Sequence, residues 1–92
     1  RLRLIVSLSL MDDYFFQNNP EKAEYFRTYF ERNYVISFKD NPDLNHAISR
    51  PYATGAAYYF KMGKTKKAKQ ILLQGLEYTP DNYLLKSRLK AL

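Results

Sequence analysis

Two stripes of small and aromatic residues, separated by a short turn at Gly63, limit the fold of this chain more than any other feature. The downstream stripe has the spacing i, i+3, i+4, i+7, i+8 of one helix face and consists of Ala68, Ile71, Leu72, Gly75 and Leu76. The upstream stripe has the same spacing and consists of Tyr52, Gly55, Ala56, Tyr59 and Phe60. Gly63 suits the left-handed position that follows a helix. Because so few residues separate the two helices, we expect them to pack antiparallel as a helical hairpin.

The ends of these two helices are predicted from residues that start or stop a helix. Ser49 is expected to cap the first helix, because Pro51 is tolerated only in a first turn. Thr65 can cap the second helix with its hydroxyl, and Pro80 cannot continue it. The sequence therefore predicts a hairpin over residues 49–79.

The N-terminal half predicts another hairpin, over residues 2–37. In its second helix, over residues 20–37, Asn19 is the expected cap and Pro20 occupies the first helical position. The apolar stripe of that helix consists of Ala23, Phe26, Phe30 and Tyr34. The start of the chain alternates apolar and polar side chains and also fits a β-strand, but no other segment offers a partner strand. We therefore expect a helix over residues 2–18 that is buried on most sides.

The rest of the chain contributes a connection and one more helix. Residues 38–48 are expected to connect the hairpins, and the turn-rich segment 39–45 within them is the expected hinge. Residues 81–92 are expected to form a C-terminal helix. Its apolar face consists of Leu85, Leu89 and Leu92.

The two hairpins resemble each other in sequence. The segment from Tyr14 to Ala23 aligns without a gap with the segment from Tyr59 to Ala68, an offset of 45 residues (14 to 59). The alignment pairs identical Tyr, Phe, Lys and Ala residues. It predicts that the chain contains one helical hairpin twice.

Residues 49–82 resemble the tetratricopeptide repeat (TPR) family. That family has a large aromatic residue, small residues where helices touch, a Tyr, a later Ala, a large apolar residue and a terminal Pro. The matching residues are Tyr52, Gly55, Ala56, Tyr59, Gly63, Ala68, Leu72, Gly75, Leu76 and Pro80. Gly55, Ala56 and Gly75 depart from the usual residues but are all small. The resemblance implies an all-α fold of antiparallel helical hairpins stacked as a short right-handed solenoid, with residues 81–92 as a cap helix.

The resemblance also implies a function. Proteins of this family are mostly non-catalytic scaffolds, in which the first helix of each hairpin lines a concave groove for a peptide or a partner domain. The groove positions in this chain are Arg50, Ala53, Ala57, Phe60 and Lys61, and the cap helix adds Leu84 and Arg88. Family members that grip a C-terminal carboxylate have Lys and Asn where this chain has Ala53 and Ala57, whereas Lys61 and Arg88 favour an acidic peptide. The alternative is that these residues pack against the rest of a longer parent protein.

A cluster of lysines points to a different kind of partner. Residues 47–92 contain nine Lys and Arg against two Asp and Glu, whereas residues 1–46 are nearly balanced. The lysine cluster consists of Lys61, Lys64, Lys66, Lys67 and Lys69. Cations at the start of a helix are opposed by the helix dipole by about 0.3–1 kcal/mol each, here with no visible structural gain.

Two interpretations of these lysines stay open. Lys64, Lys66, Lys67 and Lys69 predict an anion-binding site, for nucleic acid or an acidic lipid surface, or else they form an ordinary solvated helix face. Nucleic acid is the less favoured partner, because most of the nine tyrosines fall at core or interhelix spacing.

The composition excludes several kinds of chemistry. The chain has no Cys and a single His46, so it lacks the thiolates or paired imidazoles that bind metals, and we expect no catalytic residues, metal or cofactor. The longest apolar run, residues 4–11, is far shorter than the ~20 residues that span a bilayer. We therefore expect no transmembrane segment.

The first residue suggests that the chain is part of something longer. It begins with Arg1 and not with methionine, so we expect a segment, such as a C-terminal module, of a longer protein. By analogy of layout alone, a further alternative is an accessory domain of a larger enzyme such as a bacterial membrane glycosyltransferase.

Overall fold

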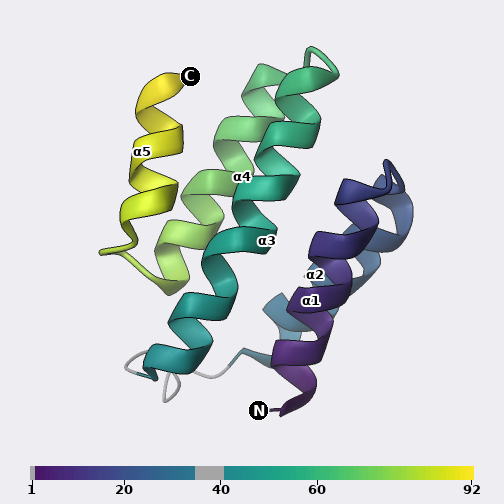
Figure 1. The fold of residues 1–92 in the computed structure, drawn as a ribbon, viewed down its shortest axis with the longest axis vertical. Helices are drawn as coiled ribbons and strands as arrows, with labels where there is room; N and C mark the ends of the chain where they lie inside the picture. Colours follow the sequence, from purple (N-terminus) through teal and green to yellow (C-terminus); the bar gives the residue numbers. More distant parts are fainter. Residues whose placement is uncertain (1, 35–40) are drawn as a thin grey trace.

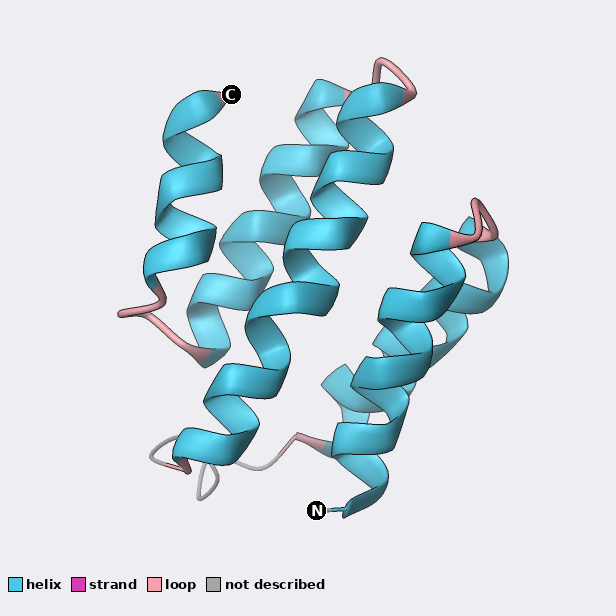
Figure 2. Cartoon of the chain, viewed as in Figure 1, coloured by secondary structure: helices cyan, strands magenta, loops and turns pink. Residues whose placement is uncertain are grey.

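The computed structural model describes residues 2–34 and 41–92. The helices are α1 (Leu2–Phe16), α2 (Pro20–Asn33), α3 (Pro42–Lys61), α4 (Thr65–Tyr78) and α5 (Tyr83–Ala91) (Figure 1). The described residues contain no β-strand (Figure 2). The prediction of an all-α fold is confirmed, and the alternating start of the chain is helical.

The helices pack as two antiparallel pairs, with α5 beside the second pair. α1 packs against α2, and α3 packs against α4 (Figure 1). In addition, α1 packs against α3, and α5 packs against both α4 and α3. All five helices share one apolar core. Fully buried side chains, one from each helix, are Leu8, Phe30, Tyr52, Ile71 and Leu85.

The buried face of α1 is narrower than the sequence predicts. Leu4, Leu8, Met11 and Phe15 are buried and follow one stripe of the helix, whereas Val6 is half exposed. The expectation that this helix is buried on most sides is therefore wrong, because α2 and α3 are the described helices that pack extensively against it.

The turns that follow α1 and α3 have the same backbone geometry. Asn18 (φ 61°) and Gly63 (φ 79°) both adopt the left-handed conformation that was predicted for Gly63, and they are paired by the alignment of the two hairpins. In each turn the amide of the next residue donates to a carbonyl five positions back, at 2.8 Å in both cases. The similarity of the two segments in sequence thus extends to their turns.

The start of α2 agrees with the sequence, but its end does not. Asn19 Oδ1 accepts a hydrogen bond from the amide of Lys22 at 3.3 Å, and Pro20 is the first helical residue. The helix ends at Asn33, and Tyr34 already has an extended backbone. The predicted continuation to residue 37 is therefore wrong at Tyr34, and residues 35–37 lie outside the described residues.

The start of α3 differs most from the prediction. Asn41, not Ser49, caps this helix, and its Oδ1 accepts a hydrogen bond from the amide of Leu44 at 3.0 Å. Burial explains the earlier start, because Leu44 and Ile48 are fully buried and continue the apolar stripe upstream. Pro51 consequently lies inside the helix.

The early start of α3 also contradicts the predicted connection and hinge. The predicted connection at residues 38–48 and the hinge at 39–45 are wrong from residue 42 onward, since that part is helical. Residues 38–40 lie outside the described residues.

The last two helices start close to the predicted positions. α4 begins at Thr65, but the predicted cap is wrong, because Lys64 occupies the capping position and no side chain makes a capping bond there. α5 begins at Tyr83 after Asn82, whose Oδ1 accepts from an amide one turn into the helix at 3.0 Å. The predicted apolar face of α5 is confirmed. Leu85 is fully buried, and Leu89 and Leu92 pack against the core.

Two glycines allow close contacts between helices. A Cβ atom added to Gly75 would lie 2.8 Å from Leu85 Cδ1 and 3.0 Å from Tyr52 Cγ. A Cβ added to Gly55 would lie 2.8 Å from both Ile71 Cδ1 and Phe15 Cε2. These positions admit no side chain without movement of a buried neighbour, which confirms the expectation that small residues permit close helix approach.

We expect Gly75→Ala to destabilise the fold. The gain in helix propensity of about 1 kcal/mol is outweighed by overpacking that typically costs about 1–3 kcal/mol. Tyr52 cannot easily yield, because it is fully buried and hydrogen-bonded at its hydroxyl. The measurement is urea unfolding followed by circular dichroism, with Gln70→Ala, at an exposed position of the same helix, as the control. A Gly75→Ala protein at least as stable as wild type would contradict this reading of the contact.

Candidate functional site

A hollow between α3 and α5 is the main candidate site. It has a volume of about 210 Å³. Ala53, Ala57 and Phe60 line it from α3, and Arg88 lines it from α5. The remaining lining residues are Ala56, Leu72, Ala91 and Leu92. Ala53 and Ala57 are one helical turn apart, so their short side chains leave the space open.

The rim of this α3/α5 hollow combines an apolar and a charged group. Phe60 is 52% exposed although it continues the apolar stripe of α3. The exposed Arg88 supplies the charge from the neighbouring helix. The hollow can therefore receive an apolar side chain next to a carboxylate.

The structure brings together four of the seven residues predicted for the groove. Ala53, Ala57, Phe60 and Arg88 all line the α3/α5 hollow. The other three, Arg50, Lys61 and Leu84, do not line it. Leu84 is half-buried and packs against the core.

Arg50 and Lys61 face the opposite side of α3, toward α1. Arg50 Nε lies 3.1 Å from Asp12 Oδ2 of α1. The Arg50 side chain also lines a hollow of about 260 Å³ between α1 and α3. Lys61 lines a third hollow, of about 310 Å³, together with Phe16 at the end of α1. Ala57 lines both this Lys61 hollow and the α3/α5 hollow. The predicted groove residues are thus distributed along both flanks of α3.

A partly buried charged cluster, which we call the Arg27 clasp, joins α2 to α3. Arg27 Nη1 donates to Glu24 Oε1 at 2.8 Å, and Arg27 Nε donates to Glu31 Oε2 at 3.0 Å. The hydroxyl of Tyr52 donates to Glu31 at 2.7 Å, and that of Tyr59 donates to Glu24 at 2.5 Å. All five side chains are therefore engaged with one another.

The pKa values of three members of the clasp, Tyr52, Tyr59 and Arg27, are raised. Burial raises the pKa of the Tyr52 hydroxyl, and the negative charge of Glu31 raises it further. Burial, followed by the hydrogen bond to Glu24, raises the pKa of Tyr59. Burial opposes the charged form of Arg27, but the hydrogen bond to Glu24 and the charge of Glu31 outweigh it and raise the pKa of the guanidinium. The raised pKa values keep Tyr52, Tyr59 and Arg27 protonated, as donors of these hydrogen bonds.

The clasp was not predicted from the sequence. Its signal is the spacing of Glu24, Arg27 and Glu31, which places an alternating charge pattern on one helix face. None of the hollows described in this subsection is lined by these three residues. The hydrogen bonds of the clasp join α2 to α3 through the two tyrosines.

The lysine cluster is exposed throughout. Lys67 Nζ lies 4.6 Å from the centroid of the Tyr59 ring, which is the geometry of a cation–π contact. The expectation that these lysines bring no structural gain is therefore wrong for Lys67. Lys64, Lys66 and Lys69 remain available to solvent.

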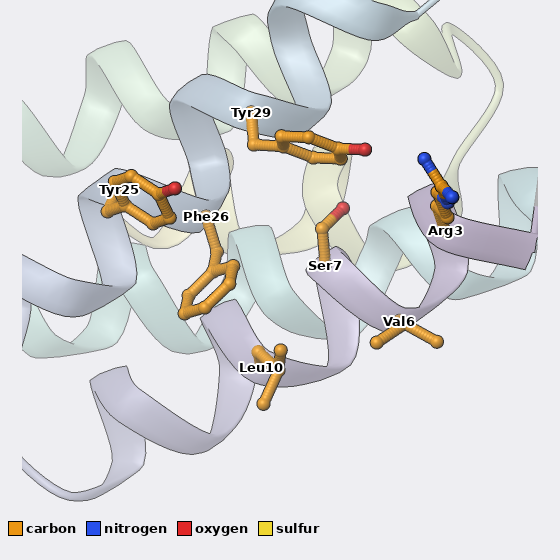
Figure 3. A pocket seen from close by; sticks show the side chains of 7 residues that line it. All are labelled: Arg3, Val6, Ser7, Leu10, Tyr25, Phe26 and Tyr29. Atoms are coloured by element: carbon orange, nitrogen blue, oxygen red, sulfur yellow. The ribbon is translucent and has the colours of Figure 1, made fainter.

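A further hollow, of about 330 Å³, lies on the first helix pair and was not predicted (Figure 3). Figure 3 shows aromatic rings of α2 on one side of this α1/α2 hollow and side chains of α1 on the other. The lining residues are Arg3, Val6, Ser7, Leu10, Tyr25, Phe26 and Tyr29. At the offset that aligns the two hairpins, Ser7 and Leu10 correspond to Tyr52 and Gly55, which are buried in the second pair. Because Ser7 stands where the second pair has a tyrosine, the space is left open.

Two negative findings concern the described residues, 2–34 and 41–92. No three His, Asp or Glu side chains in them are grouped so that they could hold a metal ion. None of the helices there combines the length and apolarity needed to cross a membrane.

Comparison with known proteins gives no relative that could assign a function. The chain matches no protein-family model, no curated protein and no solved structure.

We expect the stability of the fold to decrease as the pH rises above about 10, the ordinary pKa of tyrosine. Tyr52 and Tyr59 keep their protons in the folded chain at a pH where unfolded tyrosines lose them. The folded state then binds more protons, so the free energy of unfolding falls with increasing pH. The measurement is urea unfolding at about pH 8 and about pH 11.

The variant Tyr52→Phe isolates the contribution of the clasp. Its loss of stability between the two pH values should be smaller than that of wild type, whereas the exposed control Tyr83→Phe should behave like wild type. An equal loss in wild type and Tyr52→Phe would contradict the pKa assigned to Tyr52.

Proposed function

We propose that this chain is a non-catalytic protein-interaction domain that binds an acidic peptide segment in the α3/α5 hollow. The observation that carries the proposal is the hollow itself. Ala53 and Ala57 open it, Phe60 provides an apolar rim, and Arg88 provides a positive charge. These four residues were all expected at a groove from the resemblance to TPR proteins.

The packing order of the helices supports a TPR-like stack. α3 packs against α1, so the first helices of the two pairs are neighbours. α5 packs against α3 and continues this row of helices. The matching turns at Asn18 and Gly63 support two related hairpins. In this proposal the pairs form a short right-handed solenoid, α5 is its cap, and the hollow lies on the inner wall formed by the first helices.

The size and charge of the hollow define the ligand. Its volume of about 210 Å³ is smaller than the ~300–1,000 Å³ of typical small-molecule sites. It therefore suits one aliphatic or aromatic side chain of a peptide. Arg88 at the rim and Lys61 on the other flank of α3 are both exposed, and they favour carboxylates on either side of that anchor.

A binding role fits the titratable groups better than a catalytic one. The groups with raised pKa values in the clasp are all engaged in hydrogen bonds, those of Tyr52 and Tyr59 between α3 and α2 and those of Arg27 within α2. The residues of the hollow are mostly alanine and leucine. We therefore place no catalytic role on this chain.

Selection of random peptides displayed on phage tests the proposal. We expect selected peptides to share one large apolar residue flanked by Asp or Glu. Ala57→Arg fills the hollow and should weaken a selected peptide at least about tenfold, which corresponds to about 1.4 kcal/mol. Fluorescence anisotropy of the labelled peptide measures the affinity.

Matched variants control for effects outside the hollow. Phe60→Ala and Arg88→Glu should also weaken binding, whereas Leu73→Ala and Lys86→Glu, at comparably exposed positions elsewhere, should not. Failure to select any peptide, or equal affinity for wild type and Ala57→Arg, would contradict the proposed function.

A further inference from the structure

One end of the molecule carries exposed apolar side chains next to the lysine cluster. The turn after α1 and the turn after α3 both lie at this end, the upper one in Figure 2. Phe16, the last residue of α1, is 80% exposed, and Met62, just after α3, is 55% exposed. Phe16 and Lys61 line the same hollow, so the two helix ends are neighbours. Large apolar groups are thus presented to solvent from two segments that are distant in sequence.

The charge of this end is predominantly positive. The whole lysine cluster is exposed here, and Lys22, near the start of α2, is exposed as well. The exposed acids on the adjoining turns of α1 and α2 are Asp13 and Glu21. Cations therefore outnumber anions, and within the described residues no ion pair engages Lys64 or Lys66.

We infer that this end docks on the surface of an anionic lipid bilayer. Phe16 and Met62 enter the boundary between headgroups and acyl chains, and the lysines contact the lipid phosphates. The combination of apolar insertion with nearby basic residues is the signature of peripheral membrane binding. This surface is distinct from the α3/α5 hollow, which neither Phe16 nor Met62 lines.

The chemistry of the surface favours lipid over nucleic acid. Nucleic-acid binding through aromatic platforms uses rings on which bases stack, and a methionine thioether supplies no such platform. A single bound phosphate requires donors that converge on one point, whereas these lysines follow successive positions along the start of α4. An extended plane of anionic headgroups fits both the exposed Met62, which can enter the acyl chains, and the lysines that are spread along α4.

Vesicle binding tests the inference. The chain contains no Trp, so Phe16→Trp introduces a single emitter at the proposed insertion point. With vesicles of phosphatidylcholine and phosphatidylglycerol in equal parts, we expect its emission to shift to shorter wavelength. With vesicles of phosphatidylcholine alone we expect no shift. Tyr83→Trp places the emitter at an aromatic position that is 84% exposed, at the start of α5, and should show no shift with either vesicle.

Charge-reversal variants measure the contribution of the lysines by vesicle co-sedimentation. Lys64→Glu combined with Lys66→Glu should lower the partition coefficient by more than about twentyfold, since each lysine near an anionic surface contributes about fivefold. Both substitutions place acids at the start of α4, where the helix dipole favours them, so a loss of binding does not reflect unfolding. Arg3→Glu combined with Lys86→Glu changes the net charge equally near the starts of α1 and α5 and should have a much smaller effect.

Three outcomes would overturn the inference. The first is the absence of binding to the anionic vesicles at low salt. The second is an equal loss of binding in the two charge-reversal pairs, which would mean that net charge alone matters. The third is binding of a single-stranded oligonucleotide but not of vesicles, which would assign the surface to nucleic acid. Because Phe16, Lys64 and Lys66 lie outside the α3/α5 hollow, none of these outcomes affects the selected peptide.

Discussion

The hydrogen bonds between α2 and α3 are arranged around a single guanidinium, that of Arg27, which is held between two glutamates. Glu31 accepts from Tyr52, and Glu24 accepts from Tyr59, so two tyrosines of α3 are joined to two glutamates of α2. The tyrosines are seven residues apart, and so are the glutamates. A displacement of one helix by a single turn would therefore break both hydrogen bonds together. Each glutamate accepts from both Arg27 and a tyrosine, so removal of one partner weakens a part-buried hydrogen-bond network that the other members share.

This contact also fixes which side of α3 faces the candidate site. Tyr52 points toward α2, and Ala53, the next residue, is rotated by about 100° around the helix axis. Ala53 consequently lies toward α5, where it lines the hollow with Ala57. Gly75 allows α4 to approach both Tyr52 and Leu85 closely, so α5 is held near the same flank. The open space beside α3 thus follows from contacts made on its other sides.

Much of this arrangement is visible in the sequence, because it depends on spacing within single helices. The apolar stripes, the left-handed Gly63 and the position of Ala53, Ala57 and Phe60 on one side of a helix follow from local periodicity. The start of α3 does not follow from local periodicity. Asn41 and Ser49 are both acceptable caps with a proline nearby, and burial of the residues between them against other helices decides in favour of Asn41.

Contacts between distant residues account for the features that the sequence does not reveal. Arg50 was expected at the groove, but it forms an ion pair with Asp12 of the neighbouring helix α1. The Arg27 clasp joins residues 21 and 35 positions apart. The spacing of the clasp's charged residues places them on one face of α2, but it does not indicate which tyrosines of the chain form hydrogen bonds with that face. In each case the partner lies on another helix, and only the packing of the helices determines it.

The proline inside α3 has a consequence for the surface beside α1. Pro51 has no amide hydrogen, so it cannot supply the usual helical bond to the carbonyl of Ala47. Both residues line the hollow that also contains Arg50 and Asp12. One main-chain hydrogen bond of α3 is therefore missing beside this guanidinium and carboxylate. At this point the helix relies more on its packing against α1 and on the ion pair between Arg50 and Asp12.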